Sequence, residues 1–255
     1  MGGHLNYSWN WGILLQPEPG GTGTYLVYLV VGLGWTLATA LAAWVIALLI
    51  GSVVGTLRTT PMLWIVRLGN AYVEVFRNIP LIVQMFLWFF VVPELLPTAL
   101  GDWVKQVPPP WGSYIPAVLC LGIYTSVRIA EQVKSGIHSL ATGQRLAGTA
   151  LGLTLAQTYR HVVLPQAFRI ILPPLTSESM NIIKNSSVAL TIGLLELTGR
   201  ARAMQEFSFK VFEAFAAATV IYLLTNLVVV FGMRALERKV RVPGLIGAQA
   251  VQAGH

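Results

Sequence analysis

Charged residues are scarce in this 255-residue sequence: only 11% are Asp, Glu, Lys or Arg, less than half the share usual in soluble domains. A soluble globule with so little charge would expose too much apolar surface, and a disordered chain has the opposite composition. The single cysteine, Cys120, excludes a disulfide-stapled scaffold. Composition therefore indicates an integral membrane protein with several spans.

Catalytic and nucleotide-binding motifs are also missing from the sequence. The dipeptide Gly-Lys never occurs, so there is no phosphate-binding loop of the form G-x-x-x-x-G-K-[ST], and the nucleophile elbow G-x-S-x-G is absent. The four histidines are scattered and form no metal-ligand pattern. We expect no enzymatic activity, cofactor or metal in this chain. The net charge of +7 fits loops facing anionic lipid, and we expect no nucleic-acid partner.

Five stretches of the sequence approach the length and apolarity that a membrane-spanning helix requires, about 20 residues. They are expected at about Tyr25–Leu57, Ala71–Val92, Tyr114–Gly136, Pro173–Leu195 and Phe212–Met233. Gly51 and Gly55 form a small-xxx-small pair that indicates close packing of the first helix against another. Pro80 is expected to break the second helix. The predicted fold class is an all-α membrane protein with about five transmembrane helices.

The distribution of Lys and Arg predicts the orientation of the chain. Eleven of these 17 residues lie after the first, third and fifth spans, and four lie on the opposite side. Because basic residues gather in the cytoplasm, segment 1–24 is expected outside and the tail 241–255 inside. Between them, 25–240 forms one transmembrane domain whose cytoplasmic loop is 139–165.

The loop 139–165 has a helical pattern of its own. Gly143 can break the chain before this pattern, and Pro165, Pro173 and Pro174 are expected to limit the elements after it. We expect a short amphipathic helix, a turn, and a second helix leading into the membrane. The first helix docks on a partner, lies on lipid or is an ordinary linker. Its apolar face consists of Leu146, Ala150, Leu153 and Ala156.

A fixed spacing of small and apolar residues runs through this loop. Leu146-Ala147-Gly148 is followed by Gly152, then by Val162 and Leu164-Pro165. The spacing resembles the pattern EAA-x3-G-x9-I-x-LP of permease subunits of ABC importers, with Leu146 in place of the glutamate and Gly148 in place of the second alanine. The resemblance implies a coupling helix that inserts into a groove of an ATPase subunit. The implied coupling residues are Gly143, Leu146, Ala147, Gly148, Gly152, Leu164 and Pro165.

Other segments extend this resemblance over nearly the whole chain. The segment EVFRNIPLIVQMF resembles the E-x-FR-x-x-PL-x-VQ signature of polar amino-acid permeases, and Arg77 within it is expected to serve structure or gating. PPLTSESMNIIKNSSVAL, ALERKVRVPG, WNWGILLQ, CLGIYTSVRIAEQV and VVPELLP are similar to glutamate/aspartate importers. The resemblance implies a type I importer permease in a bacterial inner membrane, with a periplasmic N-terminus. The partners implied are an ATP-binding subunit dimer carrying ATP and Mg, a second homologous permease or a copy of this chain, and a periplasmic substrate-binding protein.

Two cations lie inside predicted spans, where charge is costly and usually functional. The planar guanidinium of Arg128 suits a carboxylate and predicts recognition of an acidic substrate. Alternatively, Arg128 snorkels to the interface or pairs with Glu131 or Glu178. Lys184 either contacts the substrate or has a structural partner on another helix.

Polar residues near Lys184 complete the predicted substrate site. In the family that the sequence resembles, aspartate is common at the position of Asn185, and an amide does not repel a substrate carboxylate. Asn185 and Ser186 can bind either a carboxylate or an ammonium, or else join helices. Glu178 and Asn181 are predicted to meet the substrate ammonium.

The predicted function is ATP-driven import of glutamate and aspartate by alternating access. The alternatives are glutamine, asparagine or another polar amino acid as substrate. An ion-coupled secondary transporter and a membrane anchor without a translocation path also remain open.

Overall fold

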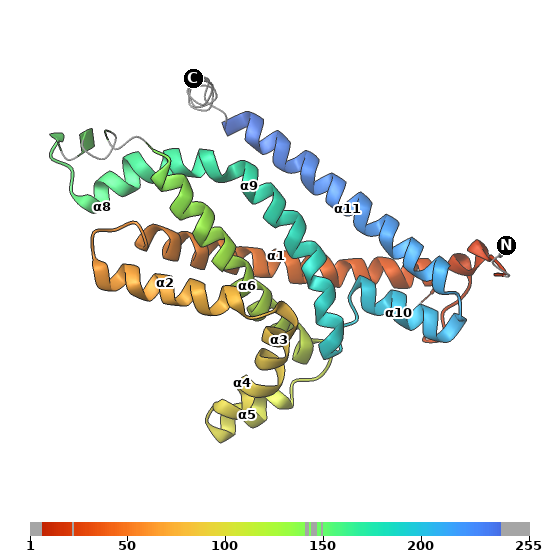
Figure 1. Cartoon of the computed structure of the whole chain (residues 1–255). Helices are drawn as coiled ribbons and strands as arrows, with labels where there is room; N and C mark the ends of the chain where they lie inside the picture. The colour runs from red at the N-terminus through yellow and green to blue at the C-terminus, as the bar shows by residue number, and fades with distance from the viewer. Residues whose placement is uncertain (1–6, 22, 141–142, 144–146, 149, 241–255) are drawn as a thin grey trace, which may run out of the picture. The chain divides into compact units, whose positions relative to one another are not determined.

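The polypeptide is almost entirely helical in a computed structural model, which describes residues 7–21, 23–140, 143, 147–148 and 150–240 (Figure 1). The helices are α1 (Tyr25–Leu57), α2 (Leu63–Asn78), α3 (Leu81–Phe86), α4 (Val92–Leu95), α5 (Thr98–Lys105), α6 (Trp111–His138), α8 (Leu155–Thr158), α9 (Leu164–Asn185), α10 (Leu197–Ser208) and α11 (Val211–Val240). Shorter 3-10 turns are η1 (Trp11–Leu15) and η4 (Ser186–Ile192), and π-helical turns are η2 (Leu87–Val91) and η3 (Tyr159–Val163). The described residues form no β-strand, so the all-α prediction is confirmed.

The long apolar helices correspond to the predicted spans. α1, α6 and α11 are each long and apolar enough to cross a membrane, and the broken pair Leu63–Asn78 plus Leu81–Leu95 supplies a fourth crossing if it counts as one. The break lies at Pro80, as predicted. The fourth predicted span, 173–195, is occupied by α9 and η4. Because of their polar residues, these two elements are not among the helices that are long and apolar enough to cross a membrane.

α9 corrects one expectation about proline. Pro173 and Pro174 were expected to limit a helix, yet both lie inside α9. The neighbouring Leu172 and Leu175 are each 3% exposed. Their burial favours a continuous helix although two amide donors are missing. Proline is tolerated in membrane helices where packing and neighbouring groups compensate for the lost bonds.

The residues form two compact units through which α1, α6, α9 and α11 each continue. The first unit comprises Met1–Leu41, Ile82–Val118 and Ile183–Asn226. The second unit comprises Ala42–Leu81, Leu119–Ile182 and Leu227–His255.

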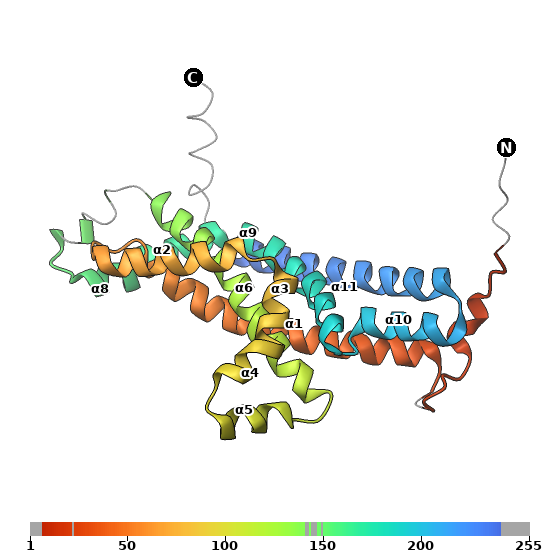
Figure 2. The ribbon, with the colours of Figure 1, turned by 60° about the horizontal axis from the view of Figure 1, so that its bottom comes forward.

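In the first unit, the core lies between the start of α1, α10 and the start of α11. Its buried members are Ile13, Tyr25, Leu29, Leu197, Ala201, Met204, Ala214 and Ala218. The carboxylate of Glu196, the N-cap of α10, accepts hydrogen bonds from Thr36 on α1, Tyr222 on α11 and the Gly199 amide. In the same unit, α4 and α5 form the short helices before α6 (Figure 2).

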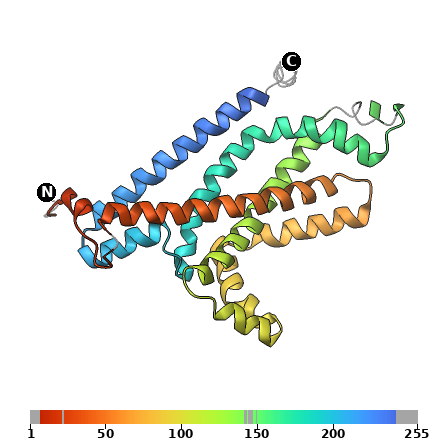
Figure 3. The same ribbon diagram turned by 180° about the vertical axis from the view of Figure 1, so that it is seen from behind.

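In the second unit, α1 and α6 pack closely through small residues. A Cβ atom added to Gly51 would lie 2.7 Å from the Ser126 carbonyl oxygen, and one added to Gly55 would lie 2.7 Å from that of Ala130. Ala47, one turn before Gly51, is fully buried. The predicted close packing at Gly51 and Gly55 is therefore confirmed. α2 runs beside this part of α1 (Figure 3).

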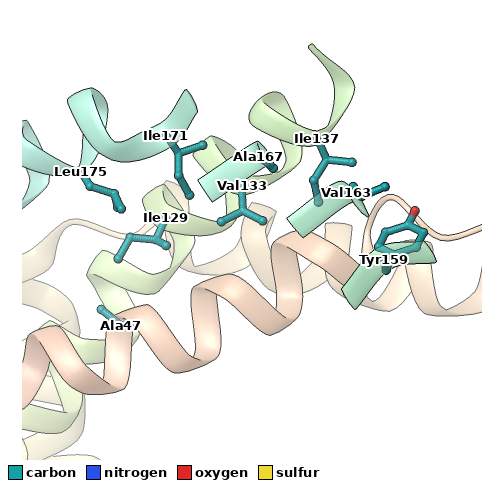
Figure 4. Close-up of a cluster of buried hydrophobic side chains, with 9 residues drawn as sticks. All are labelled: Ala47, Ile129, Val133, Ile137, Tyr159, Val163, Ala167, Ile171 and Leu175. Atoms are coloured by element: carbon teal, nitrogen blue, oxygen red, sulfur yellow. The ribbon is translucent and has the colours of Figure 1, made fainter. Parts of the chain in front are cut away.

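A continuous apolar cluster joins α1, α6, η3 and α9 in the second unit (Figure 4). Its buried members are Ala47, Ile129, Val133, Ile137, Tyr159, Val163, Ala167, Ile171 and Leu175. The α6 residues recur at steps of four, as one face of a helix requires. This cluster holds α6 against α9 and so positions the polar residues on the adjoining face of α6.

Candidate functional site

Arg128 on α6 and Glu178 on α9 come together in the second unit. Arg128 Nη1 lies 3.7 Å from Glu178 Oε2. The other oxygen of Glu178 accepts a hydrogen bond of 3.5 Å from Gln132 Nε2. Arg128 Nη2 donates to the Tyr124 hydroxyl at 3.3 Å, and its guanidinium lies over the Tyr124 ring. The Glu178 side chain is 10% exposed and that of Arg128 is 45% exposed, so the cluster joins a buried carboxylate to an accessible cation.

This geometry decides which acidic residue Arg128 contacts. Glu131, the other predicted partner, instead pairs with Arg58 at 2.9 Å. The Arg128–Glu178 separation of 3.7 Å exceeds the 2.7–2.9 Å typical of charge-assisted hydrogen bonds. A guanidinium has five N–H donors, and Arg128 directs one to Tyr124. Arg128 therefore retains donors for a carboxylate.

Two buried acceptors accompany this cation. Gln132 Oε1 and Glu178 Oε2 accept no hydrogen bond from the described part of the chain. Buried polar atoms normally have a partner. An ammonium donor can satisfy these oxygens while a carboxylate meets Arg128, so the chemistry of the cluster suits a zwitterion.

A cavity of about 420 Å³ opens between α6 and α9 beside Gln132. Its volume falls within the range of small-molecule sites, roughly 300–1,000 Å³. It is lined by Glu131, Gln132, Ser135, Gly136, Ser139, Ile170, Ile171 and Pro174. The cavity thus adjoins the polar cluster through a shared side chain.

Tyr124 and Gln132 were not predicted as site residues. Together with Arg128 they recur every four residues along α6, which places them on one helix face. Arg128 is conspicuous by its charge in an apolar helix, whereas a neutral tyrosine or glutamine is not. The four-residue step from Arg128 is the signal that could have identified both.

The remaining predicted site residues lie further along α9. Asn181 belongs to the second unit and is half-buried, but Lys184, Asn185 and Ser186 belong to the first unit. Lys184 is exposed and Asn185 is half-buried. Ser186 is fully buried, and its hydroxyl donates to the Ile183 carbonyl at 2.7 Å. Of the six predicted substrate residues, the structure brings Arg128 and Glu178 into contact.

The predicted coupling segment contains a glycine-terminated helical turn. Gly152 has φ +76°, a left-handed conformation that favours glycine. The Leu153 amide donates to the Gly148 carbonyl at 3.1 Å, as in a Schellman motif with glycine at C′. Gly148 is buried, and a Cβ atom there would lie 2.7 Å from Thr158 Cγ2. A side chain at position 148 would therefore require Thr158 to shift.

The next turn opens with a capping box. The Thr154 side chain accepts from the Gln157 amide, and the Gln157 side chain accepts from the Thr154 amide, so two backbone donors are satisfied at the start of α8. On either side of this cap, Leu151 is 80% exposed and Leu155 is 46% exposed. The segment thus presents apolar side chains on a defined backbone.

The other predicted coupling residues flank this motif. Leu164 and Pro165 begin α9, which continues without a break from the π-helical turn η3, so the prediction that Pro165 limits a helix is wrong. Gly143 and Ala147 are exposed. Leu146 lies outside the described residues.

The family described as "Binding-protein-dependent transport system inner membrane component" matches residues 47–242. This region includes α2, α6, α9, the polar cluster and the coupling segment. The chain belongs to this family. As a member of the binding-protein-dependent inner membrane components, it is a multi-pass inner membrane protein.

Curated members of this family resemble the chain along most of its length. It is 46% identical over 246 residues to the glutamate/aspartate import permease protein GltJ of Escherichia coli (strain K12), covering 96% of this chain and 100% of the relative. It is 31% identical over 207 residues to the probable glutamine ABC transporter permease protein GlnM of Bacillus subtilis (strain 168), covering 80% and 89%.

Two solved structures have a similar fold. A chain from the crystal structure of an amino acid ABC transporter with histidines aligns with TM-score 0.71 and 28% identity, covering 84% of this chain and 95% of that chain. A chain of the methionine transporter MetNI in an inward-facing conformation aligns with TM-score 0.70 and 20% identity, covering 89% and 100%. The latter similarity concerns the fold alone.

Proposed function

We propose that this chain is the permease subunit of an ATP-driven ABC importer that carries glutamate and aspartate across the inner membrane. The observation that carries this proposal is the 46% identity to the glutamate/aspartate permease of E. coli over its full length. The cluster around Arg128 supports it, because an accessible guanidinium is a suitable partner for a substrate carboxylate.

Substrate binding replaces weak contacts within the cluster. A substrate carboxylate binds the open donors of Arg128, and its ammonium binds Glu178 Oε2 and Gln132 Oε1. The loose pair between Arg128 and Glu178 costs little to separate because its atoms are 3.7 Å apart. Further substrate contacts are proposed at polar residues of α9 and η4, which follow Glu178 along the chain: Asn181, Lys184, Asn185 and Ser186.

The ATPase acts on this subunit through the coupling segment. The chain has no phosphate-binding loop of its own, so ATP and Mg are bound by a separate ATPase dimer and this subunit is not an enzyme. Leu151 and Leu155 provide exposed apolar contacts for a groove on that ATPase. The proposed coupling residues are Gly143, Leu146, Ala147, Gly148, Gly152, Leu164 and Pro165.

Nucleotide binding shifts the permease pair between inward- and outward-facing states, which is a population shift driven by differential affinity. The second permease is a homologous chain or another copy of this one. A periplasmic binding protein delivers the amino acid. The excess of Lys and Arg on one side supports a periplasmic N-terminal segment and a cytoplasmic coupling loop and tail.

The test is uptake of radiolabelled glutamate by proteoliposomes that contain the complete complex, the binding protein and internal ATP. Arg128→Glu is expected to lower uptake about tenfold or more, since it places repulsion opposite the substrate carboxylate. Arg202→Gln is the control, because the side chains of Arg202 and Glu206 form a 2.9 Å pair on the exposed face of α10. Uptake by Arg128→Glu equal to that of wild type would contradict the assignment of this residue.

Substrate identity is tested independently of the permease. Calorimetry on the cognate binding protein is expected to show binding of glutamate and aspartate. Binding of glutamine or asparagine alone would instead support an importer for neutral amino acids. ATP-independent uptake driven by an ion gradient would contradict the importer assignment.

A further inference from the structure

The turn between α1 and α2 contains polar side chains that are almost fully buried. Arg58 is 7% exposed and Thr59 is 8% exposed, although both follow the last residue of α1. The next residue, Thr60, is more exposed, and its hydroxyl donates locally to the Leu57 carbonyl. Burial of Arg58 and Thr59 is costly unless they have partners, so their partners indicate what this turn does.

Arg58 connects three helices of the second unit. Its Nε donates to Asn70 Oδ1 on α2 at 2.8 Å, and its Nη2 donates to Glu131 Oε1 on α6 at 2.9 Å. The side chain passes over Gly69, where a Cβ atom would lie 2.6 Å from Arg58 Cγ. Such charge-assisted bonds are short and directional, so they fix the end of α1 to both α2 and α6.

Thr59 connects the same turn to η3. The Tyr159 hydroxyl donates to the Thr59 carbonyl at 2.7 Å and lies 3.1 Å from Thr59 Oγ1. Tyr159 is 7% exposed and belongs to the apolar cluster that joins α6 with α9 (Figure 4). It directly follows Thr158, the residue against which Gly148 packs. The hydroxyl of Tyr159 therefore joins η3, within the coupling segment 139–165, to the α1–α2 turn.

The two connections concern the helix before the coupling segment 139–165 and a turn within it. α6 leads into this segment and is attached through Glu131, whereas η3 lies within it and is attached through Tyr159. Arg58 and Thr59, which receive these attachments, are adjacent in the chain. One turn thus links η3 to α6, the helix that carries Arg128.

We infer that Arg58, Thr59 and Tyr159 are positioning residues that make the coupling segment and α6 move as one body, so that ATP hydrolysis is converted into transport. This inference rests on the proposed function and concerns the efficiency of the conversion. Neither substrate nor ATPase needs to contact these residues.

The experiment measures ATP hydrolysis and glutamate uptake in the same proteoliposomes, with the complete complex and saturating binding protein. Tyr159→Phe removes only the hydroxyl. ATP hydrolysis is expected to remain within twofold of wild type, while uptake per ATP falls about fivefold, the effect of losing one buried hydrogen bond in an equilibrium. Thr59→Val retains the carbonyl acceptor and is expected to give a smaller loss. Thr60→Val, which removes a hydroxyl of local function only, is the matched control and is expected to leave the ratio unchanged.

The outcomes separate this inference from its alternatives. Unchanged uptake per ATP in Tyr159→Phe overturns it. A parallel fall of both rates, with less folded complex, shows a merely structural role and also overturns it. Failure of the proposed function would appear differently, because the wild-type complex itself would then show no ATP-driven uptake of glutamate.

Discussion

Alanine substitution is expected to have opposite effects on thermal stability at two glycines of α1, because only one of them packs closely against α6. In Gly51→Ala the new methyl group would lie 2.7 Å from both the Ser126 carbonyl oxygen and Ile129 Cβ. Contacts under 3.0 Å are essentially never seen for real Cβ atoms, so the helices must separate. Overpacking of this kind costs about 1–3 kcal/mol. For a chain of this size, each kcal/mol corresponds to about 2–4 °C in the thermal midpoint.

The matched control is Gly34→Ala on the same helix. A Cβ atom at Gly34 meets nothing within 4 Å, and alanine in a helix interior is favoured over glycine by about 0.5–1 kcal/mol. Gly34→Ala is therefore expected to raise the midpoint or leave it unchanged, whereas Gly51→Ala lowers it. The assay is thermal unfolding of the purified complex in detergent, followed by loss of the monodisperse peak in size-exclusion chromatography. Equal midpoints for the two variants would refute the argument from close packing.

Three further predictions concern backbone and capping groups. Gly152→Ala places alanine at φ +76° and is expected to cost about 1–2 kcal/mol, measured as weaker ATPase co-purification; unchanged co-purification would contradict it. Thr154→Ala removes the N-cap of α8 and should weaken association with the ATPase by about 1 kcal/mol. A decrease in co-purification no larger than the variation among wild-type preparations would exclude a role for the cap. Glu196→Ala leaves the hydroxyls of Thr36 and Tyr222 without their shared acceptor, so the thermal midpoint should fall by several degrees, and an unchanged midpoint would refute this.

Helix positions are best predicted from the sequence where one physical property determines them. α1 spans the predicted range because Tyr25–Leu57 contains no charge, so hydropathy alone defines it. Pro80 breaks the second helix, as expected: α2 ends at Asn78 and α3 begins at Leu81. In α9, the same proline rule was wrong because burial of residues beside Pro173 outweighs two lost amide donors.

The site was predictable only in part, for a similar reason. Arg128 and Glu178 could be identified because charge is rare in apolar helices. Their contact could not be derived from sequence, since 50 positions separate them and another acid, Glu131, was equally available. The bond between Thr59 and Tyr159 joins residues 100 positions apart, and neither has an unusual local pattern. Such pairings depend on tertiary packing, which no single sequence displays.

The two prolines of α9 have a mechanical consequence. Without amide hydrogens, Pro173 and Pro174 leave the carbonyls of Arg169 and Ile170 free of the usual helical bonds. Bending of the helix at this level therefore meets less resistance, because two backbone hydrogen bonds are missing. Flexure there changes the direction of the segment bearing Glu178 while Leu164 stays in place. A straight, rigid α9 would have to move as a whole, whereas an α9 that bends at Pro173 and Pro174 can reorient the carboxylate of Glu178 alone.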